Sequence, residues 1–116
     1  MKLKYIFSLV LFFGISHVIY SLEYTWTGQY STFYDAAGNW NVGGVESGVV
    51  PGSGDNITIP DVSGASTRYP IVRTSLLITD VTINAGATLN INGSGTLTVS
   101  GTFNASGSTT LLVQEH

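Results

Sequence analysis

Three large aromatic residues, Trp26, Tyr34 and Trp40, are the first candidates for chemistry in this chain of 116 residues. Flat aromatic rings suit the faces of pyranose sugars, so the three could form a carbohydrate-binding platform. In a module of this size, large aromatic side chains more often fill the core or cover one end of the fold. Trp26 lies in a segment that alternates polar and apolar residues, which favours burial over sugar binding.

Oxygen-bearing side chains offer a second possibility, a calcium site built from Asp55, Asn56, Asp61 and Asp80. Their spacing does not match an EF-hand loop, which requires ligands at alternate positions and a late glutamate. The chain also lacks the GGxGxD repeat of calcium-binding β-rolls. Asp55 is better explained as the residue that fixes a turn before a strand at 56–59. We therefore expect no metal and no other cofactor.

Catalytic residues are hard to assemble from this composition. A glycosidase needs two carboxylates about 5–10 Å apart beside a cleft, and a lyase needs a basic residue close to an acidic one. Apart from two lysines near the N-terminus, the basic residues are Arg68 and Arg73, while His17 lies in the apolar N-terminal segment and His116 ends the chain. The sequence predicts no active site here, and places that of any longer parent enzyme further downstream.

The N-terminus has the pattern of a secretory signal peptide. Lys2 and Lys4 precede an almost purely apolar run at residues 5–19, and the small residue Ser21 stands at a plausible cleavage point. The alternative is a transmembrane anchor, but the run is short for a span of about 20 residues and contains polar positions. We expect residues 1–21 to be removed, which makes the protein secreted or attached to the cell surface.

Charge and cysteine content limit the partners of the remaining chain. Residues 22–116 hold two arginines against seven carboxylates, a net charge of −5. Nucleic acid and anionic membranes both need clustered Lys and Arg, so neither is an expected partner. The absence of cysteine excludes disulfides, thiolate metal sites and a lipid anchor on an N-terminal cysteine.

The chain beyond the signal peptide divides into two regions and shows no helical periodicity, so an all-β fold is expected. Residues 22–75 hold the three prolines and most of the aromatic residues, and should form an aromatic, Gly-rich capping segment. Strands are expected at 24–27 and 56–59, with a turn or short helical step at 33–38 and a Gly-rich loop at 43–54. Residues 76–116 alternate apolar and polar residues in short strands.

The apolar pairs of the second region recur at a regular step. Val81 precedes Phe103 by 22 positions, Leu89 precedes Leu111 by 22, and Leu76 precedes Leu97 by 21. Three short strands in about 22 residues are the period of a parallel β-helix, in which the fourth strand stacks on the first at about 4.8 Å. The expected inward-facing pairs are Leu76/Ile78, Val81/Ile83, Leu89/Ile91, Leu97/Val99, Phe103/Ala105 and Leu111/Val113.

An antiparallel meander or a small β-sandwich is the alternative fold. Every step along residues 81–113 is even, so a meander would also keep the apolar side chains on one face. A loop at 92–96 would then pair Ile91 with Leu97 in a hairpin. The step of 21–22 residues favours the β-helix. One repeat of a solenoid cannot bury its own apolar face, so we also expect further chain beyond His116 or, as the alternative, a partner that covers the last edge.

An ordered series of motifs runs through the first region. It reads W-x-G at Trp26 and Gly28, an aromatic at Tyr34, N-W at Asn39 and Trp40, V-P at Val50 and Pro51, D-N-x-x-I-P from Asp55, and Y-P at Tyr69 and Pro70. The series resembles a module found near the N-terminus of large secreted and cell-surface proteins of gliding-type bacteria. Those proteins are adhesin-like, are often type IX secretion cargo, and are built on right-handed β-helices.

The resemblance implies a structural role for five residues of the motif: Gly28, Asn39, Pro51, Asp55 and Pro70. Tyr34 departs from the family pattern, which more often has tryptophan at that place. The 116 residues also include no C-terminal sorting domain of the kind that such cargo carries, which leaves the secretion route open.

The function implied is that of a non-catalytic structural or adhesion module of an exported β-helix protein. The expected partners are an extracellular glycan or a surface protein, together with further chain that follows residue 116. Two alternatives stay open: the non-catalytic N-terminal part of a polysaccharide-acting β-helix enzyme, and a small carbohydrate-binding β-domain.

Overall fold

The computed structural model describes residues 22–106 and 110–113, which form an all-β structure with a single turn of 3-10 helix. The expected signal peptide at 1–21 lies outside the described residues. No helix in residues 22–106 or 110–113 has the length and apolar character needed to span a membrane. The elements are β1 (Glu23–Trp26), η1 (Ala37–Asn39), β2 (Trp40–Val42), β3 (Val45–Glu46), β4 (Asn56–Ile59), β5 (Ile71–Val72), β6 (Ser75–Ile78), β7 (Asp80–Ile83), β8 (Thr88–Ile91), β9 (Thr96–Val99), β10 (Phe103–Ala105) and β11 (Thr110–Val113).

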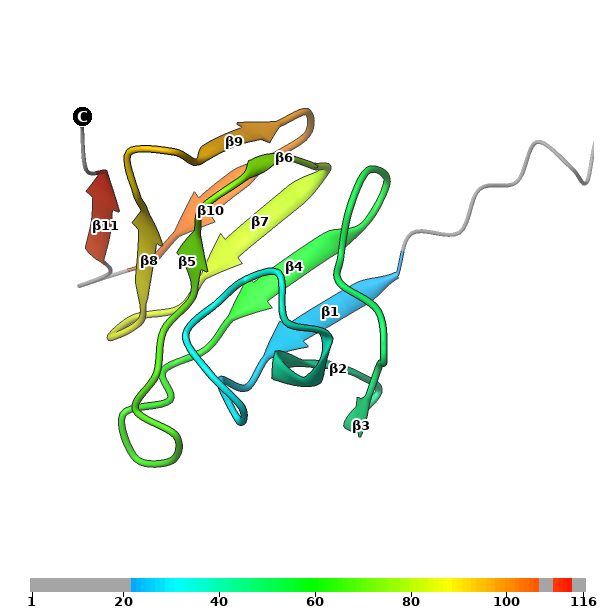
Figure 1. The fold of residues 1–116 in the computed structure, drawn as a ribbon, viewed down its shortest axis with the longest axis vertical. Coiled ribbons are helices and arrows are strands. Elements are labelled where there is room, and N and C mark those ends of the chain that lie inside the picture. The colour runs from blue at the N-terminus through cyan, green and yellow to red at the C-terminus, as the bar shows by residue number, and fades with distance from the viewer. Residues whose placement is uncertain (1–21, 107–109, 114–116) are drawn as a thin grey trace, which may run out of the picture.

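The strands form three sheets, with the orders β10-β7-β4-β1-β2-β3, β11-β8-β5 and β6-β9. From β4 onward the chain visits the three sheets in rotation, and each strand from β7 onward pairs in parallel with the strand three elements earlier. In Figure 1, β1, β4, β7 and β10 lie side by side and point the same way. The rotation begins at β4, inside the segment 22–75 that was expected to form the cap.

The sequence step of 21–22 residues appears directly in the strand register. Val81 pairs with Phe103 and Leu89 with Leu111, each 22 positions on, and Leu76 pairs with Leu97. These three pairings confirm the partners that the spacing predicts. In-register pairing places each side chain on the same face of the sheet as its partner. Apolar residues therefore stack on apolar residues.

The turn at residues 92–95 is a corner between sheets. The strands on either side of it, β8 and β9, belong to different sheets. The Oδ1 atom of Asn92 accepts a hydrogen bond from the Ser94 amide at 3.0 Å, and the Gly95 amide donates to the Asn92 carbonyl at 2.9 Å. Antiparallel pairs among the described strands are β1–β2 and β2–β3.

The N-terminal region extends the first sheet beyond β4. β1 pairs with β4 in parallel, and β2 and β3 follow as an antiparallel edge. The β2–β3 turn uses Gly43 and Gly44 at φ values of +62° and +84°, as a type I′ hairpin turn requires. The expectation of an unbroken loop at 43–54 was therefore wrong, because β3 lies within it. The short helical step is η1, which begins later than expected.

A loop segment before η1 takes the place of a strand beside β5. Phe33 forms an isolated parallel bridge with Ile71. The Ile71 amide donates to the Thr32 carbonyl at 2.7 Å, and the Tyr34 amide donates to the Ile71 carbonyl at 3.1 Å. Residues 32–34 therefore satisfy the backbone of β5 on the side opposite to β8.

The core lies between the three sheets and is most completely closed near the N-terminal strands. Ile78, Val81, Ile83 and Leu89 are 1% exposed or less, as expected for inward positions. Phe103 is 42% exposed, and Ala105 is also exposed, which differs from the expectation. Their strand β10 is the edge of its sheet, so among the described residues no further strand covers them. The side chains of Leu111 and Val113 lie outside the described residues.

Polar side chains bind successive strands at one corner of the fold. The Oδ1 atom of Asn56 accepts a hydrogen bond from the Asp80 amide at 3.2 Å. The Oδ1 atom of Asp80 in turn accepts from the Thr102 amide at 2.8 Å and from its hydroxyl at 2.9 Å. These contacts fix the register at the start of β4, β7 and β10. They also give hydrogen-bond acceptors to the backbone amides of Asp80 and Thr102.

The parallel register of β7 with β10 predicts that cysteines at Thr82 and Asn104 will form a disulfide. Neighbouring strands lie about 4.8 Å apart, within the range of about 4.4–6.8 Å that the Cα atoms of a disulfide span. The chain has no other cysteine. The Thr82→Cys/Asn104→Cys variant should therefore lose both free thiols on mild oxidation, measured by thiol labelling and mass spectrometry.

The matched control is Asn90→Cys/Thr98→Cys, the pair that a hairpin closed by residues 92–96 would bring together. Because β8 and β9 belong to different sheets, both control thiols should remain free. A disulfide in the control, with none between positions 82 and 104, would contradict the register.

Candidate functional site

The three candidate aromatic residues, Trp26, Tyr34 and Trp40, form one buried aromatic cluster. Their side chains are 1%, 3% and 0% exposed. The Trp26 and Trp40 rings meet edge to face with centroids 5.1 Å apart, and Tyr34 meets Trp40 at 4.8 Å in a similar arrangement. Aromatic pairs favour this geometry because the positive ring edge faces the negative ring face. None of the three rings offers a face to solvent on which a sugar could stack.

The polar atoms of the aromatic cluster are all used inside the protein. Trp40 Nε1 donates to the Tyr34 carbonyl at 2.8 Å, and the Tyr34 hydroxyl donates to the Pro51 carbonyl at 3.2 Å. Trp26 Nε1 donates to the Arg68 carbonyl at 2.7 Å. Burial, with a smaller contribution from the charge of Asp55, raises the pKa of the Tyr34 phenol, which therefore stays protonated and able to donate.

Asn39 is fully buried and holds the loop that precedes η1. Its Oδ1 atom accepts hydrogen bonds from the Tyr30 and Ser31 amides at 2.8 and 3.0 Å. Its Nδ2 group donates to the Ser31 hydroxyl at 3.0 Å and to the Phe33 carbonyl at 2.9 Å. Both donors and both acceptor positions of the amide are thus occupied. The sequence motif marked Asn39, and these four contacts give its physical role.

Gly28 stands where no other residue fits. Its φ angle is +65°, in the left-handed region that disfavours a side chain. A Cβ atom at this position would lie 2.4 Å from the Arg68 carbonyl oxygen and 2.8 Å from the Ser66 hydroxyl. The close approach lets the chain at 27–29 pack directly against residues 66–68.

The two motif prolines supply carbonyl oxygens from buried positions. Pro51 accepts the hydrogen bond of the Tyr34 hydroxyl. Pro70 accepts from the Asn90 amide at 3.0 Å, just before β5 begins. Proline has no amide N–H to donate, but its carbonyl can still accept. Each proline thereby attaches a connecting segment to the core.

Asp55 closes the turn that leads into β4. Its Oδ2 atom accepts from the Gly52 amide at 2.9 Å, and its own amide donates to the Gly52 carbonyl at 3.0 Å. The Asp55 carbonyl accepts from Thr79 at 3.0 Å, so the turn also joins the strand stack. These contacts describe the turn-forming role proposed for this residue.

The carboxylates considered for calcium are occupied separately. Asp61 Oδ1 accepts from the Ser63 amide at 2.9 Å and from the Tyr69 hydroxyl at 2.7 Å. The hydrogen bonds from Ser63 and Tyr69 lower the pKa of Asp61, and those from Thr102 lower the pKa of Asp80. Among the described residues, no three His, Cys, Asp or Glu side chains lie together in a group suited to a metal ion.

A hollow of about 360 Å³ lies beside the aromatic cluster, where the loop after β1 meets residues 65–68. We call it the Arg68 hollow; it is lined by Thr27, Gln29, Ala65, Ser66 and Arg68. The Arg68 Nη1 atom donates to the Gly28 and Gln29 carbonyls, each at 2.8 Å. No sequence pattern marks this site, because backbone carbonyls about 40 positions away hold the arginine.

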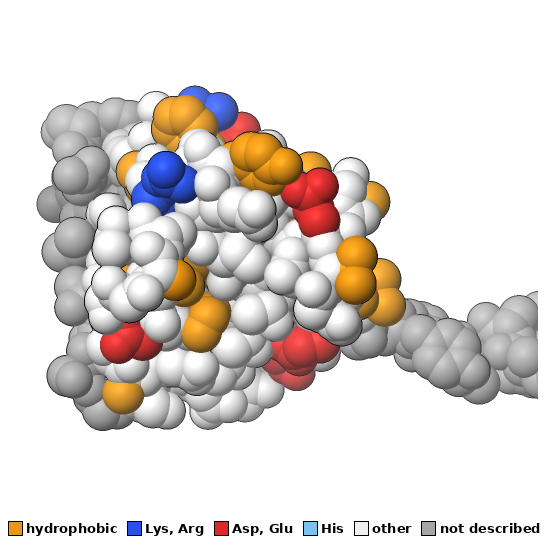
Figure 2. All heavy atoms as spheres, turned by 90° about the horizontal axis from the view of Figure 1, so that it is seen from below, with side chains coloured by type: hydrophobic (Ala, Val, Ile, Leu, Met, Phe, Trp, Pro, Cys, Tyr) orange, Lys and Arg blue, Asp and Glu red, His pale blue; other side chains and the backbone are white. Residues whose placement is uncertain are grey.

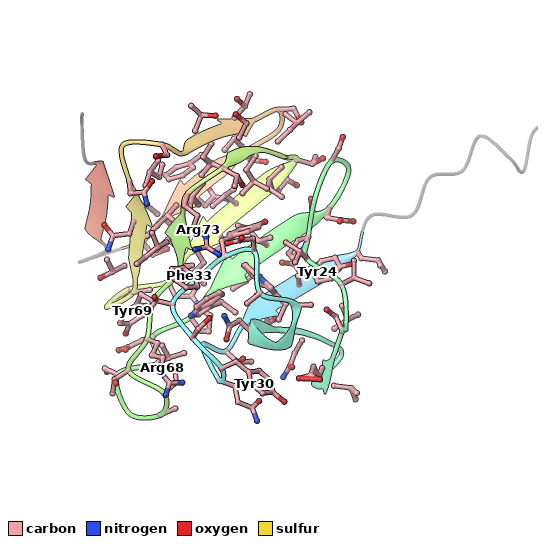
Figure 3. All side chains as sticks on the ribbon, viewed as in Figure 1. Tyr24, Tyr30, Phe33, Arg68, Tyr69 and Arg73 are labelled. Carbon is pink, nitrogen blue, oxygen red and sulfur yellow. The ribbon has the colours of Figure 1, made fainter. Side chains whose placement is uncertain are left out.

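A second arginine on the same part of the fold is paired with a carboxylate. Arg73 Nε lies 3.0 Å from Asp35 Oδ1, and Arg73 Nη2 lies 3.1 Å from Asp35 Oδ2. The guanidinium carbon lies 3.6 Å from the centroid of the Phe33 ring. Figure 3 shows the two side chains next to each other. The hydrogen bonds from Arg73 lower the pKa of Asp35.

Comparison of the chain with models of known protein families, with curated proteins and with solved structures finds no match.

The contacts of Asn39 predict a large effect of replacing this side chain. Asn39→Ala would leave two amides and one carbonyl of the 30–33 loop without their partner and should reduce the free energy of unfolding by about 2–4 kcal/mol. Asn39→Asp keeps the acceptor but loses both donors, and should also destabilise the fold. Urea unfolding followed by tryptophan fluorescence measures both.

The matched control is Asn104→Ala, which removes the same amide from an exposed position on β10. A surface change of this kind should alter the free energy of unfolding by less than about 0.5 kcal/mol. Equal effects at positions 39 and 104 would show that the buried contacts do not hold the loop.

Proposed function

We propose that this chain is a non-catalytic structural or adhesion module of an exported cell-surface protein, and that its strands form the first coils of a parallel β-helix. One observation carries the proposal: strands three elements apart pair in parallel and in register at a step near 22 residues. A strand order of this kind can be extended indefinitely, because each coil offers its successor the same edge. That property suits a long surface scaffold.

The segment before β4 acts as the N-terminal cap in this proposal. The first coil of a solenoid would otherwise expose its apolar interior and its unpaired strand edges. The aromatic cluster supplies large buried side chains at this end, β1 pairs with β4, and residues 32–34 pair with β5. These contacts support a role in closing and nucleating the coils.

An adhesion or scaffold role agrees with the composition of the outer positions. Thr, Asn and Ser occupy most of the places between the apolar residues of β7, β8 and β9. Such side chains keep the surface soluble without providing a nucleophile and base at bonding distance. The proposed partner of the last strands is further chain, stacked on β9, β10 and β11.

Repetition of one coil tests the scaffold proposal. A second copy of residues 81–102, inserted after Thr102, keeps the 22-residue register of Val81 with Phe103. A β-helix should accept the insertion, gain β-sheet signal in circular dichroism, and unfold at a temperature equal to or above that of the parent. Nearest-neighbour stacking is the reason, since each added coil contributes its own interface.

The control for this experiment inserts the same 22 residues in scrambled order, so that the apolar positions no longer stack. The scrambled variant should lose its cooperative unfolding transition. If the two insertions behave alike, or if the in-register copy also unfolds, a closed sandwich or meander is the better description.

Export is the second testable part of the proposal. The full chain, produced in a bacterium with a periplasm, should be found outside the cytoplasm. Its mass should be that of a chain that begins at Leu22. Leu11→Arg places a charge within the apolar run and should leave the uncleaved chain in the cytoplasm. A wild-type chain that remains uncleaved in the membrane or cytoplasm would contradict export as a secreted module.

A further inference from the structure

All positive charge among the described residues comes from two arginines, Arg68 and Arg73. Figure 2 shows positively charged side chains, in blue, on one face of the molecule, together with acidic side chains in red. Figure 3 shows Arg73 beside Phe33, and Arg68 on the loop that precedes β5. Residues 22–116 also carry seven carboxylates, and one of them, Asp35, lies beside Arg73.

The two guanidinium groups differ in how their donors are used. Arg73 directs its Nε and Nη2 edge at the Asp35 carboxylate and is thereby neutralised. Arg68 directs Nη1 at two backbone carbonyls. The Nε and Nη2 groups of Arg68 have no hydrogen-bond partner within residues 22–106. The edge that holds a carboxylate in Arg73 is therefore open in Arg68.

Arg68 is also held in place before any ligand arrives. Its carbonyl accepts from the buried Trp26 indole, and Nη1 is fixed by Gly28 and Gln29. A side chain held in this way loses less conformational entropy when it binds. The planar fork formed by Nε and Nη2 matches the two oxygens of a carboxylate.

The lining of the Arg68 hollow adds a second requirement. Gln29 contributes a side-chain amide, and no carboxylate lines the space. The Thr27 and Ser66 hydroxyls donate their protons to the Asn39 and Thr27 carbonyls, so towards a ligand they can only accept. The Gln29 side chain is exposed and makes no hydrogen bond within the described residues. A volume of about 360 Å³ lies at the small end of ligand sites. An exposed amide and acceptor oxygens beside one guanidinium suit a polyhydroxylated ligand that carries a carboxylate.

We propose that the Arg68 hollow binds the carboxylate-bearing sugar unit of an acidic polysaccharide. The fork of Arg68 holds the carboxylate, the Gln29 amide binds ring hydroxyls, and the Ser66 oxygen accepts a hydrogen bond from one of them. The inference deepens the proposed adhesion role and rests on it for an extracellular ligand.

Titration of the exported, purified chain with trigalacturonic acid tests the site. The fluorescence of Trp26, whose indole donates to the Arg68 carbonyl, and isothermal calorimetry both report binding. We expect binding that weakens with salt and falls at least about tenfold in Arg68→Gln, the loss expected for a charge-assisted bidentate contact. The methyl ester of the sugar should not bind.

Arg73→Gln is the matched control, since it removes the other cation of the same face and should leave binding unchanged. Gln29→Glu is a second variant that keeps Arg68 and its backbone contacts. It places a carboxylate in the hollow that should occupy the fork and abolish binding. Circular dichroism confirms that each variant retains the parent fold.

Three results would overturn the proposal: no binding of trigalacturonic acid, equal binding by Arg68→Gln or Gln29→Glu, or equally tight binding of inorganic phosphate or triglutamate. The last result would assign the hollow to anions or acidic peptides in general. The parent chain could fail to bind trigalacturonic acid and still tolerate the coil insertion. That result would refute the ligand proposal and leave the scaffold proposal standing, so the two proposals fail separately.

Discussion

Parallel stacking imposes one constraint on this chain: the first strand of each sheet needs a partner, and the first apolar layer needs a cover. The segment before β4 supplies the partners for two of the three sheets and covers the first apolar layer. β1 and the loop residues 32–34 supply backbone partners for β4 and β5. The aromatic cluster supplies volume, since Trp26 and Trp40 are the largest fully buried side chains. An uncovered edge would instead be free to pair with other chains.

The cover depends on a loop that has little secondary structure of its own. Burial of one polar residue, Asn39, replaces the hydrogen bonds that a strand would have provided. Burying an amide is unfavourable unless its donors and acceptors are used, and here all are used. The loop is therefore specific in shape, which a purely apolar contact would not ensure.

The sequence predicted the repetitive part of the fold better than the irregular part. Strand β4 and the stacking of Val81 on Phe103 follow from local alternation and a fixed step. Strands β3 and β5, of two residues each, are too short to show alternation. The Arg68 hollow was missed for a different reason, because it depends on backbone carbonyls, and any residue type supplies a carbonyl. The burial of the aromatic candidates could be predicted from their size. The carbonyls that accept their hydrogen bonds could not be predicted from the sequence.

The two arginines contact the same N-terminal segment in different ways. Arg73 is paired with a carboxylate, whereas the Nε and Nη2 edge of Arg68 stays unpaired. The Asp35–Arg73 pair is partly exposed, at 35% and 41% of the side chains, and such pairs contribute less than about 1 kcal/mol. Its main effect is thus to orient Phe33 and Arg73 at the surface. Arg68 receives its orientation from the carbonyls of Gly28 and Gln29, so its open edge needs no internal carboxylate. Because Asn39 fixes the loop that follows these carbonyls, the geometry of the hollow depends on a buried amide that does not line it.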